Sequence, residues 1–184
     1  MVCGNSEKFV REYKGREMVQ RFIYIVILLV FSLLVMFAQA DNTALRWHGW
    51  EEGVNATQAS GKYMLVDVYT DWCGWCKKMD REVYARPEVQ QLLATNFVVV
   101  KLNAESTNLI TNGTNQYTEQ ELAKMLDVNG YPTILVYNKQ FQLISRFSGY
   151  YEPREFIRYL NYISGKHYLQ FTFQEYLQKV HDDQ

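Results

Sequence analysis

The chain has 184 residues, of which 48% are hydrophobic and 21% are charged, and its formal net charge at pH 7 is −1. This length and composition suit one globular domain with a short appendage. A net charge near zero gives no electrostatic case for nucleic-acid binding, so we expect no nucleic-acid partner.

The first forty residues differ in character from the rest. Residues 22–40 are apolar and uncharged, lysines and arginines precede them, and Ala38-Gln39-Ala40 has the small-x-small pattern of a signal-peptidase site. We therefore predict that residues 1–40 are a secretory signal peptide, with Met18 as a more ordinary start. The alternative is a retained membrane anchor, because about 20 apolar residues span a bilayer. Either way the rest of the chain lies outside the cytoplasm, in the periplasm or an equivalent exported space.

The segment that follows alternates apolar strands with helices. Residues 63–69 read YMLVDVY, an apolar and β-rich run typical of a buried central strand, although Asp67 interrupts it with a charge. Gly61 can end the preceding helix in a left-handed conformation, and Pro87 suits a first helical position. We therefore predict strands at 45–48, 63–69 and 97–102, and helices at 51–60, 73–83 and 87–95.

The second half begins with a polar stretch, 104–117, that is rich in Asn and Thr and is predicted to be a loop. Capping boxes then open two helices, at Thr118 with Glu121 and at Thr172 with Glu175. We predict helices at 118–127, 153–164 and 172–180, and strands at 133–137 and 143–147. This order predicts an α/β domain over 41–164, with a mixed sheet, helices on both faces and an antiparallel edge hairpin, followed by a helical extension over 165–184.

Cysteine usage indicates redox chemistry. The three cysteines are too few for a disulfide scaffold, and removal of residues 1–40 leaves only Cys73 and Cys76. Cys73 begins a predicted helix, where free N–H groups stabilise a thiolate and where helix geometry is expected to expose the first cysteine and bury the second. Cys73 would then attack a substrate disulfide and Cys76 would resolve the mixed disulfide. Half of a zinc site is the alternative, but zinc needs four ligands and no second cysteine pair exists. We predict no metal and no cofactor.

Several blocks around this pair resemble the thioredoxin superfamily, in the family's order. They are VDVYTDWCGWCK (66–77), VKLN (100–103), GYPT (130–133) and Gly149. Residues 77–80, Tyr84 and 87–89 are closer to the periplasmic thioredoxin-like domain of membrane disulfide reductases of the DsbD type and to stand-alone exported relatives. The departures are Trp75, where thioredoxin has proline, the segment 104–117 and the tail after Gly165. The resemblance implies a thioredoxin fold.

Two carboxylates and a lysine accompany the cysteines. Burying a charge such as Asp67 in an apolar strand is costly. The functional interpretation makes Asp67 a proton acceptor for Cys76 with a pKa raised by desolvation, and the structural one pairs it with Lys101; the two are compatible. Asp80, four residues after Cys76, is either a second carboxylate near the sulfurs, as in DsbD-type domains, or a solvated charge.

Substrate contacts are expected from the aromatic residues and from Pro132. The resemblance implies a cis bond before Pro132, which would let the backbone of Tyr131 bind an extended substrate segment by strand-like hydrogen bonds. An ordinary proline at a strand start is the alternative. Trp72 and Trp75 flank the cysteines and are expected to form an apolar contact rim. The extension after Gly165 either covers the core or offers a partner surface.

The sequence therefore predicts an exported thiol–disulfide oxidoreductase that reduces protein disulfides. Negative charge at Asp67 and Asp80 favours a reductant, because it raises the pKa of a nearby thiol, whereas strong oxidants depress it. An oxidase or isomerase, or a non-catalytic metal-binding or redox-gated binding module, is the alternative. The expected partners are protein disulfides and, by the resemblance, a membrane electron donor of the DsbD type. Contact with the membrane is expected only through an uncleaved N-terminal segment.

Overall fold

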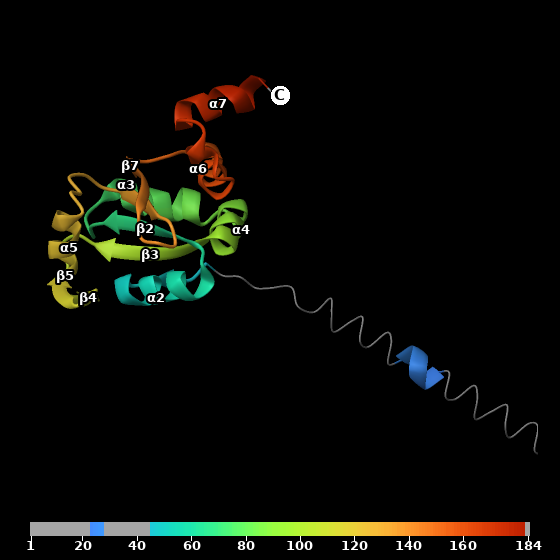
Figure 1. The fold of residues 1–184 in the computed structure, drawn as a ribbon, viewed down its shortest axis with the longest axis horizontal. Coiled ribbons are helices and arrows are strands. Elements are labelled where there is room, and N and C mark those ends of the chain that lie inside the picture. The colour runs from blue at the N-terminus through green and yellow to red at the C-terminus, as the bar shows by residue number, and fades with distance from the viewer. Residues whose placement is uncertain (1–22, 28–44, 183–184) are drawn as a thin grey trace, which may run out of the picture. The chain divides into compact units, whose positions relative to one another are not determined.

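The computed structural model describes residues 23–27 and 45–182 (Figure 1). The chain divides into two units, Met1–Asn42 and Thr43–Gln184. In the first unit, residues 23–27 form one helical turn. Almost all of the predicted signal peptide, including Ala38-Gln39-Ala40, lies outside the described residues, so export stays a prediction. No helix within the described ranges combines the length and the apolar character needed to cross a bilayer.

The second unit is built on a five-stranded mixed sheet in the order β1-β3-β2-β6-β7. The parallel strands are β1 (Trp47–His48), β3 (Phe97–Asn103) and β2 (Tyr63–Tyr69). β6 (Thr133–Tyr137) runs antiparallel to β2, and β7 (Leu143–Ser148) closes the edge antiparallel to β6. The predicted fold class, a mixed sheet with an antiparallel edge hairpin, is confirmed.

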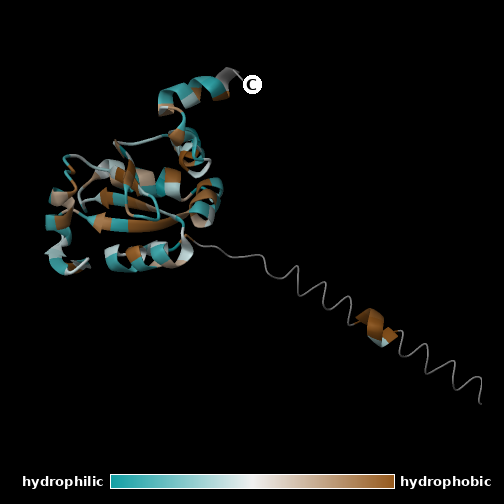
Figure 2. Ribbon diagram, in the orientation of Figure 1, coloured by the Kyte–Doolittle hydropathy of each residue, from teal (hydrophilic) through white to brown (hydrophobic). Residues whose placement is uncertain are grey.

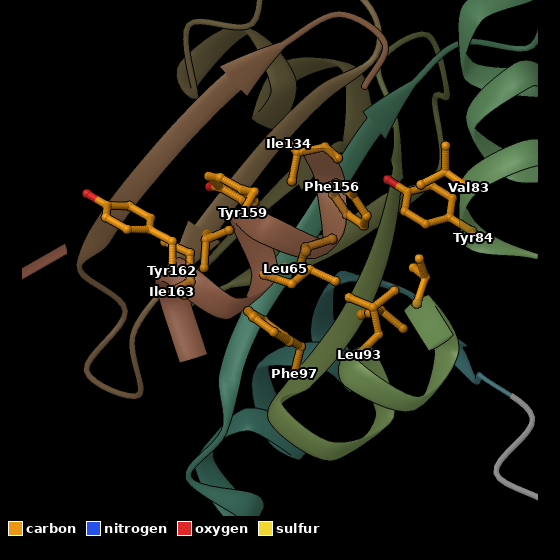
Figure 3. Packing of buried hydrophobic residues seen from close by; sticks show 14 of the residues in the cluster. Leu65, Val83, Tyr84, Leu93, Phe97, Ile134, Phe156, Tyr159, Tyr162 and Ile163 are labelled. Carbon is orange, nitrogen blue, oxygen red and sulfur yellow. The ribbon is translucent and has the colours of Figure 1, made fainter. Parts of the chain in front are cut away.

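Helices cover both faces of this sheet. One face packs against α3 (Gly74–Met79), α4 (Pro87–Asn96) and α6 (Pro153–Ser164). The other packs against α2 (Trp50–Ser60) and α5 (Glu119–Met125). Alternate residues of β2 serve the two sides, Leu65 the first and Met64 and Val66 the second, as a strand's period of two requires. Figure 2 shows these central strands as predominantly hydrophobic, and Figure 3 shows the first cluster, with Leu65 and Phe156 among its residues.

The helix after the cysteines differs from the prediction of one regular helix over 73–83. Cys73 is the N-cap of α3, and after Met79 the chain widens into a π-helical turn, η1 (Asp80–Tyr84). π-turns are rare and occur mostly at functional sites. Periodicity in the sequence does not separate a π-turn from an α-turn, because the difference is decided by what the side chains contact.

The prediction that 104–117 is a loop is wrong. This segment contains a hairpin of β4 (Leu109–Asn112) and β5 (Asn115–Thr118). Gly113, at φ 67°, takes the first position of the two-residue turn, a conformation that glycine adopts without strain. The strands are short and polar, so they lack the apolar alternation that predicts a strand, but Gly113 within this segment was an available turn signal.

The C-terminal extension packs on α6. It comprises the 3₁₀ turn η2 (His167–Leu169) and α7 (Phe173–Asp182), whose start carries the expected bonds between Thr172 and Glu175. The hydroxyl of Tyr162 on α6 donates to the Phe171 carbonyl at 2.7 Å, and Tyr176 of α7 is buried. The extension therefore covers the core on the α6 side.

Candidate active site

The two cysteines form a disulfide at the start of the helix that follows β2. Cys73 and Cys76 have Cα atoms 5.3 Å apart and are joined through their sulfurs. As the N-cap of α3, Cys73 accepts the Cys76 backbone N–H at its Sγ, 3.0 Å away. When the pair is reduced, the same N–H and the helix N-terminus stabilise a thiolate on Cys73. The position of Cys73 therefore suits a nucleophile.

Exposure does not separate the two cysteines. We expected Cys73 to be exposed, but it is only 3% exposed and Cys76 is 2% exposed. The turn before the helix holds Cys73 against the domain, because its N–H donates to the carbonyl of the buried Thr70 at 3.2 Å. What distinguishes the sulfurs is their place along the helix rather than their access to solvent.

A buried carboxylate, a lysine and a second carboxylate form one network. Asp67 is fully buried at the centre of β2, and its Oδ2 lies 2.6 Å from Lys101 Nζ. Lys101 Nζ also lies 2.6 Å from Asp80 Oδ1. Asp80 lies on the helix face that carries Cys76, four residues earlier, and its backbone N–H donates to the Cys76 carbonyl. The Asp67–Lys101–Asp80 network thus joins the sheet to the helix of the cysteines.

The charges of this network perturb one another. Burial raises the pKa of Asp67 above its ordinary value, and Lys101 opposes that shift without cancelling it. Burial alone would lower the pKa of Lys101, but the carboxylates, Asp67 foremost, hold it above its ordinary value. The ammonium also lies over the rings of Trp47, Tyr69 and Tyr84, at 4.6, 5.2 and 5.2 Å from their centroids. Lys101 is therefore a cation and Asp67 an acid of weakened strength.

Trp72 and Tyr131 form one side of an aromatic rim beside the cysteines. Trp72 is 66% exposed, and its ring meets Tyr131 edge-on at 6.0 Å. Its indole N–H donates to Glu105 Oε1 at 2.9 Å. Glu105, in the turn after β3, was not singled out from the sequence, because nothing local marks a residue that orients an indole from another segment.

Trp75 and Tyr150 form the other side. Trp75 is 57% exposed and packs against Tyr150 at 5.6 Å between centroids. Lys78 lies over the rings of both, and the Tyr150 hydroxyl donates to Glu82 at 3.2 Å. The sequence predicted that the two tryptophans form a contact rim, but it did not predict that Tyr150 belongs to the rim. Tyr150 lies far along the chain from Trp75, directly after Gly149.

The segment Gly130–Thr133 leads into β6 beside Tyr131. The Tyr131–Pro132 peptide bond is cis, and the Pro132 carbonyl accepts the Gly149 N–H at 2.8 Å. Thr133 Oγ1 donates to the Gly130 carbonyl at 2.7 Å and closes the turn. Tyr131 thereby reaches the Trp72 ring, and the segment lies at the edge of the rim.

The remaining expectations concern metals. In the part of the chain that the structure describes, no group of three His, Cys, Asp or Glu side chains is arranged to hold a metal ion. The reactive groups that the structure describes at this site are the cysteine pair and the charges of the Asp67–Lys101–Asp80 network.

Comparison with known sequences places the site in a family. Residues 50–164 match the family of the thioredoxin-like domain. The thiol:disulfide interchange protein DsbD of Actinobacillus pleuropneumoniae is 34% identical over 107 residues, which cover 57% of this chain and 17% of that protein. DsbD of Photorhabdus laumondii is 32% identical over 129 residues, 69% of this chain and 20% of that protein. The chain thus spans about a fifth of the length of these relatives.

Solved structures agree on the fold. A thioredoxin from Thermus thermophilus is 28% identical with a TM-score of 0.55, over 65% of this chain and 87% of that one. A thioredoxin-fold protein from Helicobacter pylori, at 22% identity and a TM-score of 0.54 over 65% and 79% of the two chains, shows likeness of fold alone. At family level the relatives support thiol–disulfide oxidoreductase chemistry. The chain belongs to the family of the thioredoxin-like domain.

Proposed function

We propose that this protein is an exported thiol–disulfide oxidoreductase that reduces protein disulfides with Cys73 and Cys76. The observation that carries the proposal is the Cys73–Cys76 disulfide at the start of α3. On the helix face that carries Cys76, Asp80 forms an ion pair with Lys101, and Lys101 in turn pairs with the buried Asp67. A structural disulfide needs no perturbed acid near it, whereas thiol–disulfide exchange needs a place for a proton.

The proposed cycle begins with the reduced pair. The Cys73 thiolate attacks one sulfur of the substrate disulfide, and the other substrate sulfur leaves as a thiolate. The Cys76 thiolate then attacks Cys73 Sγ and releases the second substrate sulfur. Two electrons have passed to the substrate, and the Cys73–Cys76 disulfide remains.

Asp67 is proposed to take the proton of the resolving thiol. The Cys76 thiol is protonated at neutral pH unless its pKa is depressed, and only its thiolate attacks. A carboxylate with a pKa raised towards neutrality is a better proton acceptor than an ordinary one. Lys101, held by both Asp67 and Asp80, keeps the carboxylate in place and offsets part of its charge.

Substrates are proposed to bind across the aromatic rim. Trp72, Trp75 and Tyr131 offer apolar surface on two sides of the cysteines. Residues Tyr131 and Pro132 precede β6 and would pair with an extended substrate segment through the Tyr131 backbone. An unfolded or flexible segment around a protein disulfide fits such a surface.

Export and recharging complete the proposal. The apolar segment 22–40 and Ala38-Gln39-Ala40 support export, most simply to a periplasm. Exported space is oxidising, so a reductant there must be reduced again from inside the cell. A membrane donor of the DsbD type suits this role, unless the protein substitutes for such a donor's own terminal domain. N-terminal sequencing of protein from its native host tests export, with a start at Asp41 expected; a start at or before Met18 in membrane fractions overturns cleavage.

The direction of the reaction is tested by the reduction potential of the cysteine pair. Equilibration with dithiothreitol, followed by thiol alkylation, gives that potential. A value near the roughly −270 mV of thioredoxin supports a reductant, whereas one near the roughly −120 mV of strong periplasmic oxidants makes the protein an oxidase. Reduction of insulin by the protein in the presence of dithiothreitol, faster than by dithiothreitol alone, tests the activity itself.

A further inference from the structure

The last residue of the π-turn, Tyr84, is buried against the Asp67–Lys101–Asp80 network. It is 3% exposed, and its ring packs edge-on against Trp47 at 4.9 Å between centroids. It packs in the same way against Phe156 at 5.6 Å, and Figure 3 shows Tyr84 and Phe156 in the first cluster. The Lys101 ammonium lies 5.2 Å from its ring centroid. Because η1 also contains Asp80, the π-turn brings both residues to the same lysine.

Two buried polar atoms at this place have no hydrogen-bond partner. Within residues 45–182, neither Tyr84 Oη nor Asp67 Oδ1 makes a hydrogen bond of good geometry. Both residues flank Lys101, whose Nζ lies 2.6 Å from Asp67 Oδ2 and 5.2 Å from the Tyr84 ring centroid. The Tyr84 hydroxyl lowers the pKa of Asp67, whereas burial and Asp67 together raise the pKa of Tyr84 well above its usual value. A buried oxygen left without a partner costs free energy, so two such oxygens on residues that flank the same lysine point to a bond that forms in some state of the site.

We propose that Tyr84 is a positioning residue of the redox site, whose hydroxyl donates to Asp67 Oδ1 while the carboxylate is ionised and accepts from it once Asp67 carries a proton. This inference rests on the proposed function. Lys101 Nζ occupies Oδ2, so Oδ1 is the oxygen free to receive the proton of the Cys76 thiol. A tyrosine hydroxyl can rotate between donor and acceptor, which satisfies Asp67 both before and after the transfer.

The other charged or titratable groups around the pair are few and identifiable. They are Lys101 on β3, Asp80 on η1 and Tyr69 on β2, to which the proposed function adds the Cys76 thiol of the reduced protein. The neighbours of the Tyr84 ring on β1 and α6, Trp47 and Phe156, do not titrate. Tyr84→Phe removes the hydroxyl, keeps the ring and leaves every charge of the Asp67–Lys101–Asp80 network unchanged.

The test is Tyr84→Phe in the full chain carrying Cys3→Ser, so that only the active-site pair reacts. The reduced protein is mixed with an aromatic disulfide that releases a coloured thiolate. The first release reports attack by Cys73, and the second reports resolution by Cys76. Loss of the hydroxyl leaves ionised Asp67 less stable, so its pKa rises and resolution requires a higher pH. We expect the first phase unchanged, the second about tenfold slower on the acidic side of its profile, and convergence with the parent protein at high pH.

Two variants make the result specific. Tyr159→Phe removes another buried hydroxyl without a hydrogen-bond partner, in α6, whose pKa does not respond to Asp67, and it should leave both phases unchanged. In the Asp67→Asn background, Tyr84→Phe should cause no further shift. An unchanged second-phase profile in Tyr84→Phe, or equal slowing of both phases at every pH, overturns the role of Tyr84. If the parent protein shows no second phase at all, the proposed function fails first.

Discussion

Lys101 Nζ lies 2.6 Å from Asp67 Oδ2, and the two residues are direct register partners on the parallel strands β2 and β3. Each strand carries this one charge in an otherwise mostly apolar run, so the register that buries the strands also pairs the charges. The pairing does not fully compensate the burial of Asp67, whose pKa stays raised. Ionisation of Asp67 in the folded protein therefore costs free energy.

That cost predicts a stabilising substitution. Between the ordinary pKa of Asp67 and its raised value, the folded protein binds more protons than the unfolded chain, so stability falls as pH rises through this window. Asp67→Asn removes the ionised carboxylate, and Lys101 retains its ion pair with Asp80. We expect Asp67→Asn to raise the free energy of unfolding at pH 7 by more than the roughly 0.5 kcal/mol of ordinary surface changes, with the gain vanishing towards pH 4. Urea unfolding of the oxidised protein at both pH values measures this, and a less stable variant at pH 7 contradicts it.

The cysteines should divide the work unequally. Cys73→Ala should lose insulin reduction down to the level of dithiothreitol alone, since no thiolate remains at the start of α3. Cys76→Ser should instead trap Cys73 in mixed disulfides with substrate, because the resolving attack is gone. Non-reducing gels followed by mass spectrometry detect the trapped species. Trapping by Cys73→Ala instead of Cys76→Ser would reverse the assignment.

The strands of the five-stranded sheet and most of the helices that flank it could be predicted from the sequence. Apolar periodicity and capping residues lie within each element, so they can be read without knowledge of its partners. The same holds for Asp67 and Lys101, which are visible as charges in apolar strands. The roles of Tyr84, Glu105 and Tyr150 could not be found in this way, and the sequence marks Tyr84 only as part of the resemblance to DsbD-type domains. Each acquires its role from a partner on another element, respectively Asp67, Trp72 and Trp75, and short polar strands such as β4 and β5 carry no apolar pattern to reveal their pairing.

Gly53 should be required for the packing of α2 on β3. A Cβ at Gly53 would overlap Val100 Cγ2, so either the helix or the strand would have to move. We expect Gly53→Ala to lower the free energy of unfolding by about 1–3 kcal/mol, although alanine favours a helix. Gln58→Ala, at an exposed position of the same helix, should change it by no more than about 0.5 kcal/mol. Chemical denaturation compares the two, and equal stability of the variants argues against the close approach.

Asp80 should raise the pKa of the reduced cysteine pair. Its carboxylate lies one helical turn beyond Cys76, and a nearby negative charge disfavours a thiolate. We expect Asp80→Asn to lower the thiol pKa, so that alkylation by iodoacetamide stays fast to lower pH than in the parent protein. Because Asp80 is half exposed, added salt should shrink the difference. Glu88→Gln, on exposed α4 surface, serves as the control and should leave the profile unchanged.

The pair of Trp75 and Tyr150 should govern the binding of protein substrates. The ring centroids of Trp75 and Tyr150 lie 5.6 Å apart, and Trp75 is 57% exposed, so a large apolar area is available to a bound segment. Trp75→Ala should raise KM for insulin about tenfold or more, because burying an aromatic side chain contributes about 1.5–3 kcal/mol, while kcat changes little. Reduction of a small aromatic disulfide, which spans less of the rim, should change less. Leu169→Ala removes another exposed apolar residue, in the C-terminal extension, and should leave both reactions unchanged. A fall in kcat with constant KM would instead assign Trp75 to the chemistry of the cysteines.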